Sequence, residues 1–85
     1  MAKDKFTESL NGDKQFIIDA LNHEKPFVRG FAIARLIDAK AFDDVFYNII
    51  KNMTNDEGYY ALGNSVSYIA DLYLNERKKS LVWFN

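Results

Sequence analysis

The sequence of 85 residues has no cysteine, one proline and one histidine. Without cysteine the chain can form neither a disulfide framework nor a thiolate metal site, which argues against a small secreted scaffold. It also lacks long apolar runs. None approaches the roughly 18 apolar residues of a membrane span, and none follows the charged N-terminus as in a signal peptide. We therefore expect a soluble cytoplasmic protein that makes no membrane contact.

An excess of charge of one sign is also missing, because 11 basic residues face 12 acidic ones and the net charge is -1. Nucleic-acid binders depend on a concentrated positive surface, so this composition disfavours nucleic acid as a partner. The hydrophobic fraction of 48% is too high for a disordered chain, and we expect one folded domain over residues 1–85. An aromatic fraction of 15% exceeds what a small core obviously needs and suggests a partner surface.

Helical periodicity dominates the chain. Apolar residues recur at three- and four-residue spacing, and none of the segments alternates like a strand for more than four positions. The pattern predicts an all-α domain of about four helices in two antiparallel hairpins, with a further short turn of helix at 4–10. The four predicted helices cover about residues 13–22, 26–38, 41–53 and 59–76.

Several positions carry this prediction. Asp13 is expected to cap the first helix, and Pro26 can only open the second. Gly30, inside the second helix, costs about 1 kcal/mol of helix propensity and therefore predicts close approach by another helix. The fourth helix is expected to bury a face that includes Leu62 and Tyr73. The apolar tail over 80–85 has three open possibilities: it extends the last helix, folds back, or docks on another molecule.

An internal repeat at a spacing of 33 residues aligns Phe27 with Tyr60 and Ile33 with Val66, over segments of about 13–38 and 41–76. The stretch over 22–29, with sequence NHEKPFVR, followed by Ala32 and Leu36, resembles the turn and second helix of a HEAT repeat. The chain is thus similar to a two-repeat fragment of an α-helical solenoid.

The resemblance implies a non-catalytic platform that binds proteins along its stacked second helices. The second repeat departs from the family pattern, since Tyr59 replaces the proline. In the first repeat, Lys25 stands where an acidic residue is usual. A solenoid of two repeats needs caps at its ends, and faces left uncapped would predict a dimer.

Catalytic and metal-binding constellations are not apparent. His23 lies in a turn without a second histidine or cysteine to share a metal, and we assign it no role. Asp43 and Asp44 are neighbours on a helix, so their side chains diverge and cannot act as an acid and base pair. We predict that the protein is not an enzyme and uses no metal or cofactor.

Partner binding is the remaining role for conspicuous surface residues. Tyrosine and tryptophan are enriched at binding hot spots, and an acidic middle segment opposite Arg77, Lys78 and Lys79 could steer a charged partner. The predicted partner-binding residues are Tyr59, Tyr68, Trp83, Asp43, Asp44, Asp56 and Glu57.

These features predict a non-catalytic protein-binding module. Its small size and charge pattern suggest, most specifically, an inhibitor or immunity-type protein that masks a partner such as a bacterial toxin. The alternative is a structural or oligomeric accessory protein that associates with itself through the apolar C-terminal tail.

Overall fold

The computed structural model describes residues 4–83, with side chains described from 4 to 81. The prediction of an all-α domain is confirmed, although the described chain forms five helices rather than four and adds a small two-stranded sheet. The elements are α1 (Lys5–Asn11), α2 (Gln15–Leu21), α3 (Pro26–Asp38), α4 (Asp44–Ile50), a 3-10 turn η1 (Lys51–Met53), β1 (Tyr59–Ala61), β2 (Asn64–Ser65) and α5 (Val66–Trp83).

Side chains set the starts of the first three helices. Asp4 accepts a hydrogen bond from the Thr7 amide at 2.8 Å and caps α1. Asp13 accepts one from the Gln15 amide at 3.1 Å just before α2, although the predicted cap is wrong by one residue, because Lys14 occupies the N-cap position. Pro26 occupies the first position of α3, where its missing amide hydrogen costs nothing.

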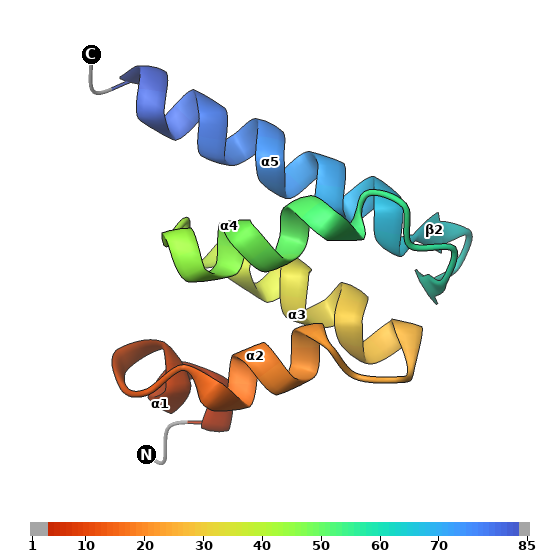
Figure 1. The fold of residues 1–85 in the computed structure, drawn as a ribbon, viewed down its shortest axis with the longest axis horizontal. Coiled ribbons are helices and arrows are strands. Elements are labelled where there is room, and N and C mark those ends of the chain that lie inside the picture. Colours follow the sequence, from red (N-terminus) through yellow and green to blue (C-terminus); the bar gives the residue numbers. More distant parts are fainter. Residues whose placement is uncertain (1–3, 84–85) are drawn as a thin grey trace.

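The helices form a stack with α3 at its centre (Figure 1). On one side α3 packs against α2, which in turn carries α1, and on the other side it packs against α5. Strand β1 also lies against α3, at the end of the molecule where α5 begins. This placement of α3 between three neighbours explains why apolar residues surround most of its circumference.

The core draws large side chains from four of the helices, and these are almost fully removed from solvent. The largest of them are Ile17 and Leu21 of α2, Ile33 and Leu36 of α3, Phe46 and Ile50 of α4, and Val66 and Tyr73 of α5. Burial raises the pKa of the Tyr73 hydroxyl above its ordinary value. This neutral hydroxyl donates to the Ala41 carbonyl at 2.7 Å and ties α5 to the loop before α4.

The predicted helix over 59–76 is wrong at its beginning and too short at its end, since α5 runs to Trp83 and the described part of the apolar tail extends the last helix. Residues 59–65 form a hairpin in which Tyr59 pairs with Ser65 and Ala61 with Asn64, and α5 starts only at Val66. Leu62, predicted to lie on the buried face, is at the hairpin turn and is 100% exposed. The next residue, Gly63, has a φ of 74°. This positive φ, which glycine adopts more readily than other residues, is incompatible with a right-handed helix and interrupts it.

Two other apolar positions reach solvent, although helical spacing places them with the apolar residues of the first and third predicted helices. Phe16 of α2 is 47% exposed and Val45 of α4 is 38% exposed. Each of these helices buries a narrower strip than its apolar residues cover: Ile17 and Leu21 in α2, and Phe46 and Ile50 in α4.

The close approach predicted at Gly30 is present, but the neighbour is a side chain rather than a helix. A Cβ atom at this position would overlap Cβ and the ring of Tyr60, which lies directly on the α3 backbone. The Tyr60 ring then meets Phe31 edge to face, with ring centroids 5.6 Å apart. Glycine thus allows the hairpin to sit on α3.

Replacing Gly30 by Ala tests this contact. Although Ala favours a helix over Gly by about 1 kcal/mol, we expect Gly30→Ala to lower the free energy of unfolding by about 1–3 kcal/mol, because the methyl group displaces Tyr60. In a Tyr60→Gly background the same substitution should be stabilising. Urea denaturation of the four proteins measures both effects, and equal effects in the two backgrounds would contradict the contact.

Candidate interaction surface

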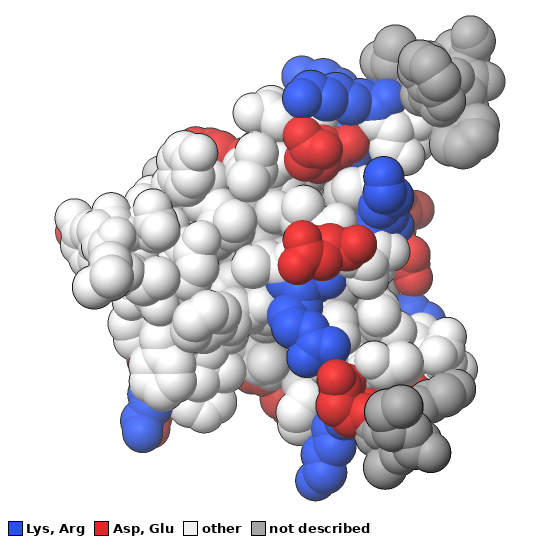
Figure 2. All heavy atoms as spheres, turned by 180° about the vertical axis from the view of Figure 1, so that it is seen from behind, with Lys and Arg blue, Asp and Glu red and all other residues white. Residues whose placement is uncertain are grey.

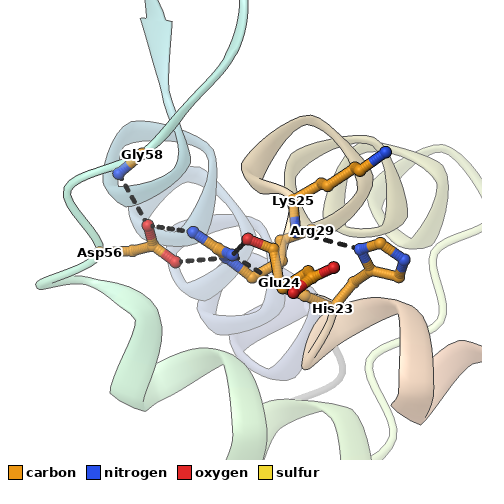
Figure 3. A network of polar contacts seen from close by, with 6 residues as sticks. All are labelled: His23, Glu24, Lys25, Arg29, Asp56 and Gly58. Carbon is orange, nitrogen blue, oxygen red and sulfur yellow. Dashed lines mark hydrogen bonds and ion pairs between the residues drawn. The ribbon is translucent and has the colours of Figure 1, made fainter.

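One polar network joins the start of α3 to the segment before the hairpin (Figure 3). Arg29 donates from Nε to Asp56 Oδ2 at 2.8 Å and from Nη2 to Asp56 Oδ1 at 2.9 Å. The two side chains are only 18% and 14% exposed. Such a two-pronged arginine–carboxylate pair is stronger and more directional than a single surface ion pair.

Arg29 also fixes the turn that leads into α3. Its Nη1 donates to the carbonyl oxygens of His23 at 2.7 Å and Glu24 at 3.0 Å. His23 Nδ1 accepts from the Lys25 amide at 3.0 Å, so the imidazole stabilises the turn. Among the described residues, no group of three or more His, Cys, Asp or Glu side chains could hold a metal ion.

Asp56 extends the network into the hairpin segment. Its Oδ1 also accepts from the Gly58 amide at 2.8 Å, and Gly58 is packed so closely on Pro26 and Arg29 that a side chain would not fit. The Gly58 carbonyl then accepts from the Val66 amide at 2.9 Å, where α5 begins. The network therefore fixes both ends of the hairpin against α3.

The network leaves a cluster of apolar side chains in solvent, which we call the aromatic end. It comprises the exposed face of the first half of α3 and the hairpin that lies against it. Phe27 is 49% exposed, Phe31 52%, Tyr59 63% and Leu62 100%, while Tyr60 is half-buried between the two elements. Phe27 and Phe31 are one helical turn apart and therefore point in nearly the same direction.

Figure 2 shows how charge is distributed around this region. The side of the molecule that carries the hairpin is a broad white area with charged side chains only at its margins, whereas acidic and basic side chains alternate along the other side. A charge-poor area that carries exposed aromatic side chains is typical of an interaction surface.

The structure brings some of the predicted partner-binding residues to this end. Tyr59 lies in β1, pointing away from α3 on the side of the strand opposite Tyr60. Tyr68 is 59% exposed in the first turn of α5, and its amide donates to Ser65 Oγ at 3.1 Å, next to the hairpin. Trp83 is the last residue of α5, and its side chain lies outside the described residues.

The predicted acidic residues are mostly engaged with cations of the same chain. Asp44 accepts from Arg77 at 2.7 Å, and Asp43 lies 3.9 Å from Lys14. Asp56 is held by Arg29, as described above. Glu57 is exposed in the segment before β1. The predicted separation into an acidic middle and a basic last turn is thus reduced by pairing between the two, as in Asp44 with Arg77.

Phe27, Phe31 and Leu62 are surface residues that the sequence analysis did not select. The available signal was the second predicted helix, whose apolar residues cover more of its circumference than a helix in a small domain usually buries. For Leu62 the dipeptide with Gly63 was the signal, because it is typical of a turn.

No protein-family model, curated protein or solved structure matches this chain. The resemblance to HEAT repeats stays a prediction. In the part of the chain that the structure describes, no helix combines the length and apolar character needed to cross a membrane.

The ion pair with Arg29 predicts how stability depends on pH. Hydrogen bonds from Arg29, aided by the Gly58 amide, hold the pKa of Asp56 below its ordinary value of 3.8. The carboxylate therefore stabilises the fold fully above that value, and the stabilisation is lost as pH falls through the lower, folded-state pKa. At about pH 7 we expect Asp56→Asn to lower the free energy of unfolding by about 1–3 kcal/mol.

The difference between wild type and Asp56→Asn should shrink towards about pH 2.5 in urea denaturation followed by circular dichroism. Asp4, whose pKa is lowered by the Thr7 amide and Arg35, retains some acid sensitivity in the variant. Asp71→Asn, at an exposed position of α5, is the control and should leave the wild-type pH profile unchanged. A difference for Asp56→Asn that is independent of pH would contradict the role of the charge.

Proposed function

We propose that this protein is a non-catalytic protein-binding module whose contact surface is the aromatic end. The observation that carries the proposal is the exposure of Phe27, Phe31, Tyr59 and Leu62 together at a charge-poor end of the molecule. Large aromatic side chains dominate the energetics of protein interfaces, and interface cores are depleted in charge. Covering these four side chains removes apolar area from water.

Preorganisation supports a binding role. Association is weakened when side chains and loops must be ordered on binding. Here the Arg29–Asp56 pair and the contact between Gly30 and Tyr60 already hold the hairpin on α3. The free energy gained by covering the aromatic rings is therefore available for affinity.

Our narrower proposal is that binding masks the partner, as an inhibitor or immunity-type protein does. A rigid surface of this kind suits masking because it can cover a partner's site without rearranging. The aromatic end supports this role better than the acidic residues do, since Asp44 and Asp56 are already paired within the chain.

A matched pair of substitutions tests where the partner binds. Phe27 and Phe16 are each the second residue of a helix and are 49% and 47% exposed, but Phe16 lies in α2, beside α1. A carboxylate in the first turn of a helix interacts favourably with the helix dipole and stabilises the helix. Both Phe27→Glu and Phe16→Glu should therefore fold. We expect Phe27→Glu to weaken partner binding by at least about tenfold and Phe16→Glu to leave it nearly unchanged.

The partner is obtained by affinity capture from the source cells, purified, and titrated against the three proteins by calorimetry. Circular dichroism checks that each variant is folded. Equal dissociation constants for wild type and Phe27→Glu, or an equal loss with Phe16→Glu, would contradict the assignment of the aromatic end.

A further inference from the structure

We infer that, in the free protein, the aromatic end is covered by a second copy of this chain in a dimer with two-fold symmetry. The inference rests on the proposed role of the aromatic end as a contact surface and names its occupant. Three properties of that end favour a second copy: its area, its lack of charge and its shape.

The apolar area is what a small dimer interface requires. A fully covered Phe or Tyr buries roughly 150–250 Å², so Phe27, Phe31, Tyr59 and Leu62, at their observed exposures, offer roughly 500 Å². A stable interface buries about 800 Å² on each partner. About 65% of a homodimer interface is apolar, which corresponds to about 520 Å². The aromatic end can therefore supply the apolar centre of such an interface.

Charge also favours self-association. Because burying an unpaired charge is costly, a charge-poor surface is best covered by another charge-poor surface, and a second copy presents one. Arg29, which contacts the segment before the hairpin, is already paired with Asp56, and the exposed charges of Lys25 and Glu57 lie two residues before Phe27 and Tyr59, at the margin of this end. With a net charge of -1, two copies repel each other only weakly.

The shape of this end suits a macromolecular surface rather than a small ligand. Small-molecule sites are concave, and two open hollows in the described part of the chain lie away from this end. One, of about 520 Å³, lies beside His23 and Asn52, and another, of about 450 Å³, lies between Tyr47 and Leu74. The aromatic end instead projects at the hairpin turn, where Leu62 is wholly exposed.

Apolar area of this size also marks an interaction site. The largest apolar patch of a monomeric protein is about 300–600 Å², and such a patch is often functional. A second copy is present wherever the protein is made. Dissociation of the dimer would then expose the same surface to a different protein.

Sedimentation velocity over about 1–500 µM tests the dimer. We expect the wild-type mass to rise with concentration to about twice 9.8 kDa. Phe27→Glu should raise the dimer dissociation constant by at least about tenfold, and Phe16→Glu should leave it unchanged. A wild-type protein that stays monomeric throughout overturns the inference, as does a dimer that Phe16→Glu weakens equally.

A second measurement locates the interface without disrupting an aromatic contact. Because the chain has no cysteine, Leu62→Cys carries a single polarity-sensitive fluorophore. Its emission should shift to shorter wavelength as the dimer forms, whereas the same label at Asp71→Cys, on the exposed side of α5, should not shift. Equal shifts at both positions overturn the location.

The outcome is separable from that of the proposed function. If the wild type is monomeric but its captured partner still binds less tightly to Phe27→Glu, the dimer is rejected and the proposed protein-binding function stands. If the protein forms a dimer that Phe27→Glu does not weaken, the aromatic end is not the dimer interface, whatever effect calorimetry shows on partner binding.

Discussion

The pair formed by Arg29 and Asp56 is the interaction on which the arrangement of this molecule depends. Its two hydrogen bonds, at 2.8 and 2.9 Å, join α3 to a segment 27 residues further along the chain. With Arg29 also bound to two carbonyl oxygens of the preceding turn and Asp56 bound to the Gly58 amide, the pair connects three segments. Both side chains are largely buried, which protects the pair from the screening that weakens surface ion pairs.

This pairing also determines which apolar side chains stay exposed at the surface. The hairpin lies on α3, so the ring of Tyr60 occupies the space above Gly30 and leaves Phe27 and Phe31 beside it in solvent. Interior packing is completed elsewhere, by α2 and α5 on other faces of α3 and by α4, which packs against α2 and α5. The fold therefore combines a well-packed core with an apolar end that packing within one chain does not cover.

The helices of this protein could be predicted from the sequence because their signals are local. Pro26 and the helical spacing of apolar residues define α3 in full, and Asp13, predicted as the cap of α2, lies one residue before the actual N-cap. The hairpin could not be predicted in the same way, since strands of three and two residues are too short to show a period of two.

The site depends on contacts between residues that are distant in the sequence. Nothing local indicates that Arg29 pairs with Asp56 or that Tyr60 lies on Gly30. A surface role for Tyr59 and Tyr68 could be predicted from residue type, whereas for Leu62 the only local signal was the adjacent Gly63, which indicates a turn. Residue type likewise suggested a surface role for Asp56, whose side chain is instead held within the fold.

Native-state hydrogen exchange in Arg29→Gln tests most directly whether this pair holds the hairpin in place. The Val66 amide, which donates to the Gly58 carbonyl, and the paired amides of residues 59–65 should exchange much faster than in the wild type. The amides around Ile33 and Leu36, in the middle of α3, should keep a larger share of their protection. Unchanged protection in the hairpin, or an equal loss throughout the chain, would contradict the account.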